Sequence, residues 1–159
     1  MTVGTSSFFA TALLPETAAP ARLIVCERSG RWAIALRRQL AEAGVQVHQS
    51  RGLADCWELL REAPGSFLVV EVAPAETEGL LRRLARLHRE FPLARLAVVA
   101  DRAGAGCQWL LREAGAVHFT CSPRQLGPLA GVVCRHLAQV PAPPQTLSDR
   151  LWASLPWKP

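Results

Sequence analysis

The chain is built from two kinds of segment: apolar runs of strand length, and longer segments with a helical spacing of apolar residues. Continuous apolar runs of strand length occur at residues 22–26, 67–70 and 96–100. Such runs are typical of parallel strands that are buried on both faces. Residues 116–121 form a further run, and residues 45–49 alternate apolar with polar. The alternation predicts a strand nearer the edge of a sheet.

The segments between these runs have a helical spacing of apolar residues. The clearest is 77–90, where Leu80, Leu84 and Leu87 recur at helical intervals and arginines occupy other positions. Pro92 then prevents the helix from continuing. The same reasoning predicts four more helices, at residues 31–43 with Gly44 as the C-cap, 53–62, 106–113 and 124–139. We interpret DRAGAG, residues 101–106, as a flexible loop that opens the helix at 106.

Five strands, each followed by a helix, define the predicted fold class. Parallel strands joined by right-handed helical crossovers place helices on both faces of the sheet. We therefore predict an α/β fold with a doubly wound, five-stranded parallel sheet.

The predicted α/β domain spans residues 21–139. We interpret residues 1–20 as a disordered leader, because their apolar patch lacks the positive start of a secretory signal. Residues 140–146 are predicted to be a stiff, Pro-rich linker. Residues 147–159 form a predicted amphipathic tail that packs either on its own domain or on a partner.

Composition narrows the class of protein. Half of the 159 residues are hydrophobic, but no apolar run approaches the roughly 18 residues of a membrane span. The five cysteines are an odd number without a CxxC pair, and the four histidines are scattered. This usage predicts reduced thiols in a cytoplasmic protein and no metal cluster.

The net charge of +5 comes almost entirely from arginine, since Lys158 is the only lysine. A basic chain can have an acidic partner. The arginines, however, lie on helical patterns without a basic block or interleaved aromatic residues. This distribution disfavours nucleic-acid binding and favours a solvated helical face.

Ligands of doubly wound sheets bind outside the carboxyl ends of the strands, so these ends carry the candidate chemistry. An acid, Glu71, closes the run at 67–70. The remaining strand ends are Cys26 and Glu27 after the first strand, Ala100 and Asp101 after the fourth, and Ser122 with Pro123 after the fifth.

The βα order, these strand-end residues and the phrase GAVHFTCSP at 115–123 resemble the receiver domain of response regulators. The resemblance covers roughly residues 21–139 and implies the flavodoxin-like strand order 2-1-3-4-5. In that family an acid pair ends the first strand and binds Mg²⁺, and an Asp ends the third strand and accepts phosphate. A Thr or Ser ends the fourth strand, and a Lys before a Pro ends the fifth.

The resemblance assigns these roles to residues that depart from the family pattern. The acid pair corresponds to Cys26 and Glu27, and the phosphoacceptor to Glu71. The switch hydroxyl corresponds to Ala100 and the lysine to Ser122. Glu27 and Glu71 could still hold Mg²⁺ weakly, but the lysine and the hydroxyl are lost. We therefore expect no catalytic residue, no metal site, no required cofactor and no phosphoryl chemistry.

The resulting hypothesis is a stand-alone, degenerate receiver-like domain that is not an enzyme. It would act in signal transduction as a phosphorylation-independent protein–protein interaction module, with another signalling protein or a second copy as partner and no membrane. In receivers, the fourth helix, fifth strand and fifth helix carry most partner contacts. By resemblance, the candidate partner-binding residues are Trp109, His118 and Arg135, together with Trp152 and Trp157 of the tail.

Two alternatives remain open at this stage. One is a phosphorylatable receiver in a phosphorelay. The other is a phosphatase or phosphocarrier based on Cys26, since LIVCERSGR resembles the start of low-molecular-weight tyrosine phosphatases. Arg31 follows Cys26 after four residues instead of the five of that loop, which favours a buried structural cysteine. Glu71 is either a fixed charge paired with Arg28 or Arg102, or an exposed acid at a strand end.

Overall fold

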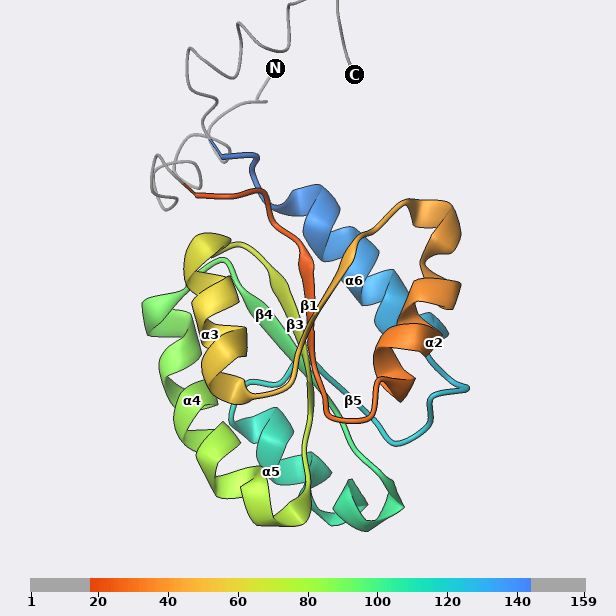
Figure 1. Cartoon of the computed structure of the whole chain (residues 1–159). Helices are drawn as coiled ribbons and strands as arrows, with labels where there is room; N and C mark the ends of the chain where they lie inside the picture. Colours follow the sequence, from red (N-terminus) through yellow and green to blue (C-terminus); the bar gives the residue numbers. More distant parts are fainter. Residues whose placement is uncertain (1–17, 144–159) are drawn as a thin grey trace, which may run out of the picture.

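The computed structural model describes residues 18–143, which form a five-stranded parallel sheet of order β2-β1-β3-β4-β5 (Figure 1). Every neighbouring pair of strands is parallel. This confirms the predicted α/β class and the predicted strand order. In sheet order the strands are β2 (Val47–Ser50), β1 (Leu23–Cys26), β3 (Phe67–Glu71), β4 (Arg95–Val99) and β5 (His118–Thr120).

Helices cover both faces of the sheet (Figure 1). One face packs against α3 (Leu53–Glu62), α4 (Thr77–Glu90) and α5 (Gln108–Glu113). The other face packs against α2 (Arg31–Gln39) and α6 (Gly127–Gln139). Short 3₁₀ helices complete the connections: η1 (Ala41–Ala43), η2 (Pro74–Glu76) and η3 (Arg102–Cys107).

The central strands explain the continuous apolar runs. Successive side chains of a strand point to opposite faces of the sheet. Ile24 and Leu68 therefore join the core under α3, α4 and α5, whereas Val25 and Val69 join the core under α2 and α6. The strand β2 lies at an edge of the sheet and is less buried, as its alternating sequence predicts.

The bounds of several predicted elements differ from the structure, including the helix predicted at 106–113, which begins at Gln108. The α-helix predicted to reach residue 43 ends at Gln39, and Gly44, with φ of 64°, caps the following 3₁₀ turn η1. The last helix begins at Gly127 instead of 124, with a Pro in its first turn. Residues 102–107 form the 3₁₀ helix η3 instead of a flexible loop. A Cβ atom at Gly104 would lie 2.8 Å from the Ala100 Cβ, so η3 packs too closely for a side chain there.

None of the helices within residues 18–143 is long and apolar enough to cross a membrane. The predicted leader, linker and tail fall largely in residues 1–17 and 144–159, outside the described residues. Trp152 and Trp157 are among the residues not described.

Candidate functional site

The carboxyl edge of the sheet carries a cavity of about 650 Å³. Its walls come from the loops that follow β1, β2 and β3, so segments far apart in the sequence meet there. The lining includes four of the strand-end residues singled out from the sequence: Cys26, Glu27, Glu71 and Asp101. The position agrees with the general location of ligand sites in doubly wound sheets.

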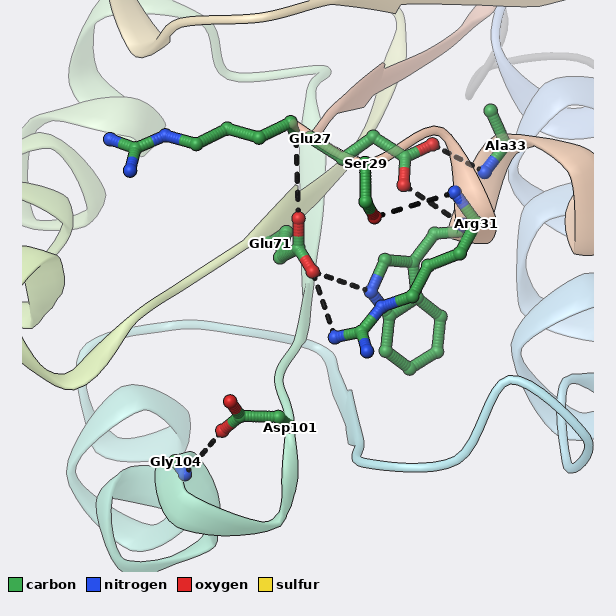
Figure 2. Close-up of polar contacts among 9 residues, drawn as sticks. Glu27, Ser29, Arg31, Ala33, Glu71, Asp101 and Gly104 are labelled. Carbon is green, nitrogen blue, oxygen red and sulfur yellow. Dashed lines mark hydrogen bonds and ion pairs between the residues drawn. The ribbon is translucent and has the colours of Figure 1, made fainter.

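Glu27 is buried, with 2% of its surface exposed, and acts as an acceptor for the start of α2 (Figure 2). Its carboxylate oxygens accept hydrogen bonds from the Trp32 backbone N at 2.8 Å and the Ala33 backbone N at 2.6 Å. These amides belong to the first turn of α2, whose N–H groups have no partner within the helix. The N-cap position is Gly30, in the left-handed conformation with φ of 80°, and it supplies no side-chain acceptor. Glu27 satisfies those donors instead.

Glu71 is held by three donors (Figure 2). Its Oε1 accepts from the Arg31 guanidinium at 2.9 Å and from the Trp32 indole Nε1 at 3.1 Å. Its Oε2 accepts from the Arg28 backbone N at 3.3 Å. The side chain of Glu71 is only 19% exposed. Both oxygens are therefore occupied by groups of the same chain.

These contacts correct the predicted partners of Glu71. Its ion-pair partner is Arg31, not Arg28 or Arg102. The Arg28 guanidinium pairs with Glu76. Neither Arg31 nor the Trp32 indole was predicted to reach Glu71, because they follow β1 and are about forty residues away in the chain.

Arg31 and Trp32 tie the start of α2 to the end of β3. The Arg31 guanidinium lies 5.2 Å from the Trp32 ring centroid, within cation–π range. Trp32 is fully buried and contributes its ring to the core under α2 and α6. A buried indole N–H needs a hydrogen-bond acceptor, and the Glu71 carboxylate accepts from it.

The other two strand ends are also internally satisfied. Ala100 is fully buried, and its backbone N donates to the Thr120 carbonyl. Asp101 caps η3, with its Oδ1 accepting from the Gly104 backbone N at 3.1 Å (Figure 2). Ser122 is partly buried, and its backbone N donates to Thr120 Oγ1 at 3.3 Å. Residues 18–143 contain no lysine that could neutralise a charge beside Ser122; the single lysine of the sequence is Lys158.

The arrangement does not fit the magnesium site that a receiver fold implies. Oxygen ligands for Mg²⁺ must be free to face the ion. The carboxylates of Glu27, Glu71 and Asp101 are instead bound to donors of the chain. Within residues 18–143, no cluster of three or more His, Cys, Asp or Glu residues could hold a metal ion.

Solved structures similar to this chain include response regulators and a CheY-like protein. A response regulator from Thermotoga maritima matches with a TM-score of 0.63 and 22% identity, over 76% of this chain and all of that chain. A CheY-like protein (tadZ) from Pseudomonas aeruginosa PAO1 matches with a TM-score of 0.58 and 18% identity, over 73% of this chain and 98% of that one. An orphan response regulator of H. pylori matches with a TM-score of 0.57 and 17% identity, over 76% and 98%.

The chain has a receiver-like fold. No family model matches the sequence, and no curated protein matches it. At these identities the likeness concerns the fold, so the chemistry of the receiver-like domain has to be argued from its own residues.

The surface predicted to bind partners lies at the β5 edge of the receiver-like domain. Trp109 on α5 is 71% exposed, and two more apolar residues are exposed: Leu110, which follows it on α5, and Val117, which precedes β5. Leu110 and Val117 were missed, because an apolar residue near a short helix is normally assigned to the core. We call Trp109, Leu110 and Val117 the α5–β5 surface.

The other two predicted partner-binding residues flank this surface. His118 is half-buried on β5, and burial together with the nearby Arg112 charge lowers its pKa. Arg135 is exposed on α6, where its Nε donates to the Gly131 carbonyl at 3.3 Å. Because α5 and α6 cover opposite faces of the sheet, Trp109 and Arg135 lie on different sides of β5.

Proposed function

We propose that this receiver-like domain acts in signal transduction as a protein–protein interaction module that does not depend on phosphorylation. The observation that carries the proposal is the state of Glu71. Arg31, Trp32 and the Arg28 amide occupy both of its carboxylate oxygens. The domain is thereby proposed to be a binding protein and not an enzyme.

The chemistry of acyl phosphates explains why these contacts matter. A carboxylate that accepts a phosphoryl group must attack in line, while cations neutralise the transferred oxygens. At this edge the cationic Arg31 pairs with Glu71, so its charge neutralises the carboxylate at the acceptor position and not an incoming phosphate. Ala100 has no hydroxyl to contact a phosphate, and Ser122 has no positive charge. We infer that neither phosphoryl transfer nor Mg²⁺ is part of the function.

The Cys26 alternative has less support from the same contacts. A thiol phosphatase needs an arginine that holds the substrate phosphate above the thiolate. Arg31 is the residue of the loop after Cys26 that would take this role, and it binds Glu71. Cys26 is also only 5% exposed.

The α5–β5 surface supports the binding part of the proposal. Exposed aromatic and aliphatic side chains on neighbouring elements are typical of sites where another protein docks. The proposed partner is another signalling protein or a second copy of the chain. All five cysteines are free thiols, which fits the proposed location in the reducing cytoplasm.

Intact mass after incubation with Mg²⁺ and a small acyl-phosphate donor tests the chemical part. We expect no phosphate adduct on the wild-type protein, on Glu71→Ala or on Cys26→Ser. An adduct that is lost only in Glu71→Ala would identify a phosphorylatable receiver. An adduct that is lost only in Cys26→Ser would identify thiol-based phosphotransfer.

Affinity capture with Trp109→Ala tests the binding part. Ile34→Ala is the matched control, because Ile34 is an exposed apolar residue on α2, on the other side of the sheet. We expect a partner that binds wild type and Ile34→Ala, binds Trp109→Ala at least about tenfold more weakly, and ignores added acyl phosphate. Equal binding by all three proteins would contradict the role of this surface.

A further inference from the structure

The cavity at the carboxyl edge of the sheet has two walls that the candidate site described above does not use. One wall is the turn from β2 into α3, with Arg51 and Leu53. The other is the connection from β3 to α4, with Ala73, Ala75 and Gly79 of the first turn of α4. In the sheet β1 lies between β2 and β3, so the two walls begin about 10 Å apart, on either side of the end of β1 (Figure 1).

The size and the walls of the cavity are those of a small-molecule site. Cavities that hold small ligands measure roughly 300–1,000 Å³ and combine apolar walls with a few polar groups. This cavity measures about 650 Å³. Leu53 is half-buried on one wall, and Ala73 and Ala75 are exposed on the other. Apart from its chain neighbours, no side chain of residues 18–143 lies within 4 Å of a Cβ atom built at Gly79, so the space above the first turn of α4 is open.

Three arginines line the cavity, and two of them have an acid of the chain as partner. Arg31 pairs with Glu71, and Arg28 pairs with Glu76. Arg51 is exposed and makes no ion pair with any of residues 18–143. A guanidinium matches the two oxygens of a carboxylate. A carboxylate supplied by a ligand would give Arg51 the partner that the other two arginines already have.

The other charges of the lining favour a ligand with a single negative charge. Against the three arginines stand four acids, Glu27, Glu71, Glu76 and Asp101. The three glutamates are each bound to donors of the chain. Asp101 follows β4, which lies three strand spacings, about 14 Å, from β2. One anionic group at Arg51 is therefore neutralised, whereas a second would find no cation left in the lining and would be repelled by the acids.

We propose that this cavity binds a small organic monoanion, namely a carboxylate with an aliphatic or aromatic body. The carboxylate pairs with the Arg51 guanidinium. The apolar body lies between Leu53 and the segment 73–75, above Gly79, while Glu71 keeps its contacts with Arg31. No residue of the α5–β5 surface lines the cavity, so this inference does not rest on the proposed binding function.

Isothermal titration calorimetry of the full chain with sodium octanoate tests the proposal. Octanoate carries one carboxylate on an apolar chain, and we expect it to bind with a Kd below about 1 mM. 1-Octanol has the same chain without the charge and should bind at least about tenfold more weakly. A Kd for octanoate above about 1 mM, or equal affinities for octanoate and 1-octanol, would overturn the proposal.

Substitutions on the two walls locate the bound octanoate. Arg51→Gln removes the charge and should weaken binding at least about tenfold, whereas Arg51→Lys keeps a charge and should weaken it less. Gly79→Leu places a side chain in the open space of the cavity and should abolish binding. It should not lower the Tm, because leucine favours a helix more than glycine does.

The matched control is Arg86→Gln, since Arg86 is an exposed arginine on α4 that does not line the cavity. We expect this variant to bind octanoate as the wild type does. Wild-type affinity in Arg51→Gln or in Gly79→Leu would show that octanoate binds elsewhere and would overturn the assigned site. An equal loss in Arg86→Gln and Arg51→Gln would show that only the net charge of the protein matters, and would also overturn it.

Discussion

The side chains at the carboxyl edge of the sheet are bound to groups of the same chain, whereas those of the α5–β5 surface are exposed to solvent. At the edge, Glu27, Glu71 and Asp101 are all bound to donors of the same chain. On the α5–β5 surface, the side chains of Trp109, Leu110 and Val117 are all exposed to solvent. The position where receivers perform chemistry is thus closed by internal contacts, and an apolar surface elsewhere is left open. The difference supports the proposed role of this domain in binding.

The contrast has a physical basis. A buried carboxylate is costly unless hydrogen bonds or an opposite charge compensate for its lost hydration. The chain supplies that compensation from the first turn of α2, through backbone amides, the Trp32 indole and the Arg31 guanidinium. The exposed apolar side chains have no such compensation within the domain, and binding to a partner would remove their surface from water.

The largest effect is expected for Glu27→Ala, which removes the acceptor of two buried amides at the start of α2. Its loss should lower the free energy of unfolding by about 2–4 kcal/mol, measured by urea denaturation. Glu27→Gln is the control, because an amide oxygen still accepts one of the bonds and should cost less. Equal stability of wild type and Glu27→Ala would show that the carboxylate does not stabilise the helix.

A double-mutant cycle on Arg31 and Glu71 should give the next largest effect. Glu71 is mostly buried, so we expect a coupling energy of about 1–2 kcal/mol between Arg31→Ala and Glu71→Ala. The Arg82–Glu78 pair on α4 is the matched control, because both side chains are well exposed. Its coupling should stay below about 0.5 kcal/mol. Similar couplings for the two pairs would remove the distinction between the edge and an ordinary surface.

A smaller effect is expected from pH, through His136 on α6. Burial lowers the pKa of His136, and the nearby Arg95 charge acts in the same direction, against the hydrogen bond to the Gly65 carbonyl. The unfolded chain then binds the proton more readily than the folded one. The free energy of unfolding should therefore fall as pH drops below about 6.5, the ordinary pKa of histidine.

Urea denaturation at pH values of about 7.5 and about 5.5 measures this slope. His136→Gln should reduce it. Burial also lowers the pKa of His48 and His118, so part of the slope should remain. An unaltered slope in His136→Gln would assign the pH dependence to other groups.

The smallest effect on stability is expected for Trp109→Ala. A side chain that is 71% exposed contributes little to the core, so the free energy of unfolding should change by less than about 0.5 kcal/mol. Trp57→Ala is the control of the same type, and it should cost about 3 kcal/mol or more because Trp57 is buried. A large loss in Trp109→Ala would mean that this tryptophan serves the fold and not a partner.

The sequence predicted most of the fold because its signals are local. The helices at 53–62 and 77–90 match the structure residue for residue, since apolar spacing and the following turn define both. The apolar runs placed all five strands to within about three residues. Helix ends without a strong signal were wrong, as at Gln39, where the backbone tightens into a 3₁₀ turn before Gly44.

The site was predicted less completely, because its contacts are not local. Glu71 was identified from its place at a strand end, but its partners Arg31 and Trp32 lie about forty residues earlier. Trp32 was assigned to an apolar helix face, and its ring does pack in the core. That assignment did not predict a partner for the indole N–H.

The pairing of Arg31 with Glu71 has a consequence for how such a protein can be controlled. A domain that receives its signal as a covalent mark can be switched on and off within one molecule. Here Glu71, at the acceptor position, is paired with Arg31 in the folded chain. The α5–β5 surface is exposed in that same folded state. Under the proposed function, the number of copies made, degraded or sequestered would set how many partners are bound.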